Sequence, residues 1–275
     1  MNEHNQHIAS AQSDDEHKTL HWWRLLKSLA TLNIALWCIA SLSLGYFTDH
    51  IHHLTWWHLT LSGTYTAVCA FRSYLPRIDL ERYVLSDRFA SSMVFGRSAA
   101  TIAEVSFAIQ MKLFLDEISA LAGVDWVATW SPIVIALLCV AQVFCWLGVL
   151  TLNHLGHTIE EAIWGSVFVY IGVAICLCLS TLEGVWWTIG VIGATSSWIY
   201  VLFMFSVDVP MYYRRWRQGQ SEGVTTLTLR AGWRDALYRR EYTRSWEIWR
   251  PEAMWLTGYF ACAVWLSIGL SMLPR

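Results

Sequence analysis

Charged residues are scarce in this chain. Over 275 residues, 15% are Asp, Glu, Lys or Arg and 55% are hydrophobic, whereas about a quarter of an average soluble domain is charged. Lysine is rarest and occurs only at positions 18, 27 and 112. The formal net charge of −2 carries no information about nucleic acid because the charges are segregated along the chain, and we expect no nucleic-acid partner. The composition excludes an ordinary soluble domain.

Several motifs that would assign a function are missing. The seven cysteines have no Cys-x-x-Cys spacing, so we interpret them as small buried apolar residues rather than a disulfide or metal framework. There is no His-Glu-x-x-His motif, repeated His box or Asp-rich diphosphate motif. The last apolar stretch lacks the lysine of a retinal Schiff base. Glu160-Glu161 is not followed by the arginine of a CaaX protease, and no histidine beyond position 157 could build a zinc-dependent seven-helix hydrolase.

Haem is also excluded. A b-type haem needs two histidines at matched depth on facing helices. His58 is expected near the outer side of the membrane and His154 near the inner side, so they cannot form such a pair.

The N-terminus does not resemble a signal peptide. Residues 1–21 are polar and lack a basic region before a cleavable apolar core. We predict a disordered cytoplasmic tail over residues 1–21.

The chain contains several long hydrophobic stretches. A helix needs about 20 apolar residues to cross a hydrocarbon core of roughly 30 Å, and seven stretches approach or exceed that length. We predict an all-α polytopic integral membrane protein, with residues 22–275 forming one seven-helix bundle. The expected spans are Leu26–Phe47, Leu54–Phe71, Ala99–Phe114, Ala128–Leu152, Ile159–Leu182, Trp186–Val207 and Met254–Leu273.

Basic residues are distributed unevenly between the connections. Arginines and lysines precede the first stretch and fill the segments between the second and third and between the sixth and seventh, whereas residues 48–53, 115–127 and 183–185 contain neither. The positive-inside rule then places the N-terminus in the cytoplasm and the C-terminus outside. The inner connection 153–158 is an exception because it has no basic residue.

Two cytoplasmic segments carry apolar residues among arginines. We predict that Ser73–Gly96 and Leu229–Trp249 are amphipathic helices lying in the headgroup region, with guanidinium groups toward lipid phosphate. The 18 tryptophans include pairs at predicted helix ends, as in an interfacial aromatic belt. Membrane lipids are therefore the expected partners.

Polar residues inside the apolar stretches are the candidates for function, because such groups are costly there. Glu104 lies about two turns into the third span. Gln142, Trp146, Val149 and Asn153 follow helical spacing and form one stripe along the fourth span. Asp208 ends a similar stripe on the sixth span. We expect Glu104 and Asp208 to share a cavity near the inner surface with residues 154–161.

The connection between the fourth and fifth spans contains His154, His157, Glu160 and Glu161. If Thr158 caps the fifth helix, Glu161 completes a Thr-x-x-Glu capping box, which is a purely structural role. Alternatively, these residues bind a divalent metal together with Glu104 and Asp208, or act as an acid/base set.

The preferred function is a membrane-embedded enzyme acting on a lipid-soluble or isoprenoid-like substrate from the cytoplasmic leaflet. Its expected catalytic residues are Glu104, Asp208, His154, His157 and Glu160. The expected substrate contacts are Arg97 for an anionic or polar head, Trp146 and Trp164 for the apolar end, and Gln142 and Asn153. The alternatives are a transporter or channel whose path is lined by Glu104, Gln142 and Asp208, or a non-catalytic assembly or sensor subunit.

Overall fold

The chain is almost entirely helical. A computed structural model describes residues 2–47 and 52–275, without the side chains of residues 2–12 and 47. Helix accounts for 83% and strand for 2%, which confirms the all-α prediction. In chain order the elements are α1 (Asn2–Phe47), α2 (His53–Tyr74), β1 (Arg77–Ile78), β2 (Tyr83–Val84), η1 (Phe89–Ser91), α3 (Met93–Ala122), α4 (Asp125–Trp130), α5 (Pro132–Thr151), α6 (His154–Cys178), α7 (Gly184–Phe203), η2 (Met204–Asp208), α8 (Val209–Ser221), α9 (Leu229–Tyr238), β3 (Glu241–Tyr242) and α10 (Trp246–Ser271).

Among residues 2–47 and 52–275, six helical segments are long and apolar enough to cross a membrane, and each overlaps a predicted span. The predicted span Leu54–Phe71 falls in α2, which is not one of the six because threonine, serine and histidine interrupt its apolar residues. The structure thus supports a membrane-spanning helical protein, while the count of seven spans is not confirmed. The six segments are Ser13–Tyr46, Met93–Ala122, Asp125–Thr151, His154–Cys178, Gly184–Ser221 and Trp246–Ser271.

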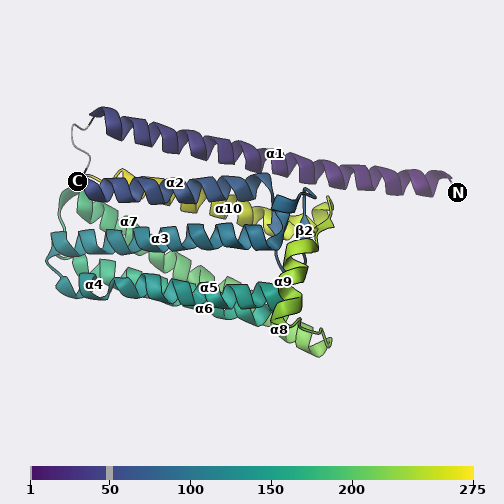
Figure 1. The fold of residues 1–275 in the computed structure, drawn as a ribbon. Helices are drawn as coiled ribbons and strands as arrows, with labels where there is room; N and C mark the ends of the chain where they lie inside the picture. The colour runs from purple at the N-terminus through teal and green to yellow at the C-terminus, as the bar shows by residue number, and fades with distance from the viewer. Residues whose placement is uncertain (1, 48–51) are drawn as a thin grey trace. The chain divides into compact units, whose positions relative to one another are not determined.

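The helices form two compact units. The first contains Met1–Ala103 and Leu237–Arg275, and the second contains Glu104–Ala236, so the division falls inside α3. Within the first unit, α1, α2 and α10 pack against one another (Figure 1). Buried Asn33 of α1 joins this packing, because its amide donates to the carbonyl of Phe260 at 2.9 Å and accepts from Trp265 Nε1 at 2.9 Å.

Residues 2–21, for which the sequence predicts a disordered tail, are helical in the structure and form the start of α1. Neither proline nor glycine interrupts the chain from residue 2 to residue 44, so nothing in the covalent structure stops the helix. Its described side chains also meet the beginning of α10. The carboxylate of Asp15 accepts from the amide of Trp246 at 2.8 Å, and Arg244 pairs with Glu16. Composition alone did not reveal these partners, which lie more than 200 residues away in sequence.

The two predicted interfacial helices are only partly present. Ser73–Gly96 is not one amphipathic helix, because it contains the hairpin of β1 and β2 and the short η1. The second segment does contain a helix, α9, followed by β3. Strand β2 pairs antiparallel with β1 and parallel with β3, forming a three-stranded sheet within the first unit. Strands of two residues are too short to produce a detectable alternation, so the sequence pattern could not predict this sheet.

In the second unit, α6 is the common packing partner. It contacts α5, α7, the π-helical turn η2 and α8. Gly172 accommodates Trp198 of α7, since a Cβ at that position would lie 3.2 Å from the indole ring. Helix α6 and the elements around it supply most of the polar residues described next.

Candidate functional site

The site is built on a tight turn between α5 and α6. Leu152 adopts a left-handed backbone conformation with φ of 57° and ends α5. Asn153 then caps α6, because its Oδ1 accepts from the amide of Leu155 at 3.0 Å. The predicted cap at Thr158 is therefore wrong, since α6 begins four residues earlier, at His154. Thr158 instead donates to the carbonyl of His154 at 3.0 Å, inside the helix.

Two glycines let the helices approach closely beyond the turn. A Cβ added to Gly156 would lie 2.6 Å from the Cα and amide nitrogen of Gly148 and from the carbonyl of Phe144. All three are backbone atoms, which cannot rotate out of the way. Small residues at such crossings are how membrane helices achieve close contact. The approach brings the inward face of α5 within reach of the first turns of α6.

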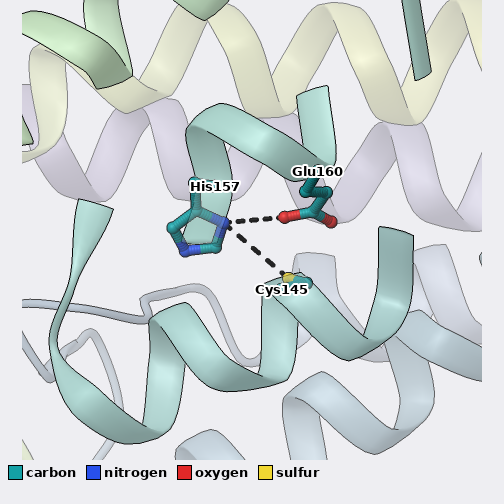
Figure 2. Close-up of side chains that lie close together, drawn as sticks. All are labelled: Cys145, His157 and Glu160. Carbon is teal, nitrogen blue, oxygen red and sulfur yellow. Dashed lines mark hydrogen bonds and ion pairs between the residues drawn. The ribbon is translucent and has the colours of Figure 1, made fainter. Parts of the chain in front are cut away.

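At this crossing, Cys145 of α5 meets His157 and Glu160 of α6 (Figure 2). His157 Nδ1 lies 2.8 Å from a carboxylate oxygen of Glu160 and 3.8 Å from the sulfur of Cys145. His157 and Glu160 are three residues apart and so occupy the same helix face. All three side chains are buried, and one donor atom from each lies within 4.8 Å of the others.

This arrangement differs from a nucleophilic triad. In a triad the nucleophile and the orienting carboxylate use opposite nitrogens of the imidazole ring. Here both the thiol and the carboxylate face the same nitrogen, Nδ1. Among the residues that the structure describes, this is the group of His, Cys, Asp and Glu that could hold a metal ion. Thiolate, imidazole and carboxylate together are a ligand set that suits zinc and related transition metals.

A second polar pair lies on the same face of α5. Gln142 is one turn before Cys145, and its amide donates to a carboxylate oxygen of Glu104 at 2.5 Å. Both side chains are buried. The structure therefore brings together two of the predicted site residues from different helices, and the amide orients the Glu104 carboxyl group.

His154 and His157 share a neighbour that the sequence did not reveal. The ring of Tyr212, from α8, lies 5.2 Å from the ring of His157 and 6.2 Å from that of His154, measured between centroids. Arg215 stacks over the same tyrosine at 5.7 Å. Within the described part of the chain, His154 Nδ1 is buried and has no hydrogen-bond partner. These aromatic contacts connect α8 to the start of α6.

Asp208 is buried at the end of the π-helical turn η2, which packs against α6. Pro210 follows two residues later and cannot donate a backbone hydrogen bond, so a widened turn is a natural way to accommodate it. Widened turns of this kind occur frequently at functional sites. The shared cavity of Glu104 and Asp208 stays a prediction.

The remaining predicted residues have different surroundings. Trp164 is buried one turn beyond Glu160 and stacks on Phe168 with centroids 6.2 Å apart. Trp146 stacks on Trp233 of α9 at 5.8 Å, and this packing is an alternative to its predicted contact with substrate. Asn153 has the capping role described above. Arg97 is buried in the first unit, whereas the other predicted site residues lie in the second.

The sequence pattern does not single out Cys145, because the spacing of the cysteines indicates small buried apolar residues. A signal was present nonetheless. Gln142, Cys145 and Gly148 are spaced by three residues and all are buried, so they share one face of α5. A cysteine between a polar residue and a glycine on an inward face is a candidate for more than packing.

Comparison of the chain with models of protein families gave no match, and comparisons with curated proteins and with solved structures gave none either.

Proposed function

We propose that this protein is a membrane-embedded enzyme that acts on a lipid-soluble or isoprenoid-like substrate. Its reactive centre would be the polar cluster of α3, α5 and α6, open to the cytoplasmic leaflet. In this proposal α2 is a seventh span, the N-terminus is cytoplasmic and the C-terminus lies outside, as the arginine distribution favours.

The observation that carries the proposal is the concentration of buried reactive groups in apolar helices. Glu104, Cys145, His157 and Glu160 are all buried within segments long and apolar enough to span a membrane. Ionisable groups at such positions are costly and mark functional sites by default. A purely structural role would require only satisfied hydrogen bonds, which a neutral amide or hydroxyl could supply at lower cost.

The proposed roles follow from the contacts. Glu104, oriented by Gln142 at 2.5 Å, would transfer a proton to or from the substrate. His157 and Glu160 would form a second reactive group, with Cys145 as its third member. Asp208 would contribute a further carboxylate from η2. Buried Trp164 would line the apolar end of the substrate site.

The test compares lipid extracts from cells that express the wild-type chain, Glu104→Gln or Glu117→Gln. Both substitutions remove a carboxylate from α3, but Glu117 lies outside the cluster, so it is the matched control. We expect the wild type and Glu117→Gln to deplete one lipid-soluble species and accumulate a product, as seen by mass spectrometry. Glu104→Gln should slow this conversion by about 10² or more, the usual contribution of an acid/base group.

Two outcomes would contradict the proposal. Lipid profiles identical to those of cells carrying an empty vector, at equal levels of inserted protein, would exclude an activity on the lipids of that host. Full activity in both Glu104→Gln and Asp208→Asn would remove the acid/base role. Movement of an unchanged solute across proteoliposomes would instead favour the transporter alternative.

A further inference from the structure

The donor atoms of Cys145, His157 and Glu160 converge on one point from two helices (Figure 2). We propose that these three side chains bind a single transition-metal ion, with zinc the best fit, and leave one coordination position open. The inference concerns the cluster alone, and it rests on the proposed function only where it assigns that open position a catalytic use.

The distances fit such an ion. Zinc lies about 2.3 Å from a thiolate sulfur and about 2.0–2.2 Å from nitrogen or oxygen ligands. Ligands around a tetrahedral ion are therefore roughly 3.3–3.6 Å apart. The sulfur of Cys145 is 3.8 Å from His157 Nδ1, and this nitrogen is 2.8 Å from the Glu160 oxygen. The third separation, between the Cys145 sulfur and the Glu160 oxygen, is at most 4.8 Å. Binding the ion therefore requires the Glu160 side chain to rotate, so that its oxygen moves about half an ångström away from Nδ1 and lies within ligand range of the sulfur.

A hydrogen bond at Nδ1 of His157 can satisfy only one of its two neighbours at a time. A single imidazole nitrogen carries either a hydrogen or a lone pair. If Nδ1 carries a hydrogen and donates it to Glu160, the sulfur of Cys145 faces an N–H that is already bonded to the carboxylate. If Nδ1 carries a lone pair and accepts from the Cys145 thiol, the Glu160 carboxylate faces that lone pair. A cation at the centre lets all three atoms act as electron donors at the same time.

Charge balance supports the same conclusion. A thiolate and a carboxylate together carry two negative charges, and a divalent ion cancels them. The loaded site then has no net charge, which suits helices whose length and apolar composition match a membrane span. The thiolate also selects the metal, because sulfur disfavours magnesium and calcium, whereas a mixed sulfur, nitrogen and oxygen set is typical of zinc.

Three protein ligands are the number found in catalytic zinc sites, where water or substrate occupies the fourth position. The Gln142–Glu104 pair lies one turn away from Cys145 along α5. The carboxylate of Glu104 would then accept a proton from a water held at the open position and later return it. This role belongs to the proposed function.

The experiment measures metal in the full-length protein, purified in detergent without chelators. Elemental mass spectrometry should find about one zinc per chain. Replacement of zinc by cobalt should produce the near-ultraviolet absorption of a cobalt–thiolate bond. Cys145→Ser should abolish that absorption, and His157→Ala and Glu160→Gln should weaken metal binding at least about tenfold. Cys178→Ser is the control, because Cys178 is equally buried in α6 but lies outside the cluster.

Absence of stoichiometric metal in the wild type, together with no cobalt–thiolate absorption after incubation with cobalt, would overturn the inference. So would unchanged cobalt absorption in Cys145→Ser. If Cys145→Ser fails to insert, Glu160→Gln keeps the shape of the side chain and decides the question by its metal affinity. Bound metal without any change in lipid profile would uphold the metal site and count against the enzyme proposal. Lipid turnover by protein without metal would uphold the enzyme proposal and count against the metal site.

Discussion

Replacing Gly156 by alanine tests the close approach of α5 and α6. The new Cβ would lie 2.6 Å from backbone atoms of Gly148 and Phe144, whereas ordinary contacts begin at 3.4 Å. The helices must therefore separate by up to about 0.8 Å, the difference between these distances, because backbone atoms cannot rotate aside. Overpacking of this kind costs about 1–3 kcal/mol. Alanine regains about 0.8–1.0 kcal/mol through its higher helix propensity.

The net expectation is a loss of stability of up to about 2 kcal/mol, seen as a lower melting temperature in detergent. The effect on the cluster should be larger. Metal ligands tolerate deviations of about 0.2 Å, and the shift moves Cys145 away from His157 by several times that amount. We expect cobalt affinity to fall by roughly 10- to 100-fold, in the range seen when the surroundings of metal ligands are changed.

Gly258→Ala is the matched control, because Gly258 lies inside α10 and an added Cβ there would meet no atom within 4 Å. This variant should be as stable as the wild type or slightly more so. The reasoning would be refuted if Gly156→Ala melted at the same temperature as Gly258→Ala and bound cobalt equally well. That result would mean that α5 and α6 do not cross at these glycines.

Two further predictions concern the helix cap and a buried arginine. Asn153→Ala removes the acceptor for the amide of Leu155, so unfolding should become easier by about 1 kcal/mol, while Asn153→Ser should restore most of the melting temperature. Arg77 of β1 is buried beside Asp79, with 3.5 Å between Nε and a carboxylate oxygen, and burial lowers the pKa of Arg77 to about 9. Below pH 9 the buried charge of Arg77 opposes folding. Above that pH the native state releases a proton that the unfolded chain retains, so folding becomes more favourable as the pH rises. The wild type should therefore gain stability relative to Arg77→Met between about pH 8 and pH 10. Equal melting-temperature changes in the two proteins over that range would contradict this assignment.

The sequence was sufficient for features that depend on local composition. Apolar runs predicted the long helices because burial in hydrocarbon requires length and hydrophobicity, which are both written along the chain. The pairing of His157 with Glu160 was also within reach, since residues three apart share a helix face. The helical stripe that contains Gln142 correctly marked the inward face of α5, where Glu104 finds its partner.

Only the tertiary structure decided which of these faces meet. Cys145 joins His157 because Asn153 starts α6 directly after the left-handed Leu152, and because Gly148 and Gly156 allow the backbones to touch. The sheet of β2 and β3 pairs residues about 160 positions apart, and Asp15 of α1 is held by a contact with the start of α10. Periodicity reports which side of a helix is apolar, but the choice of partner is a property of the packed molecule, set by steric fit between distant segments.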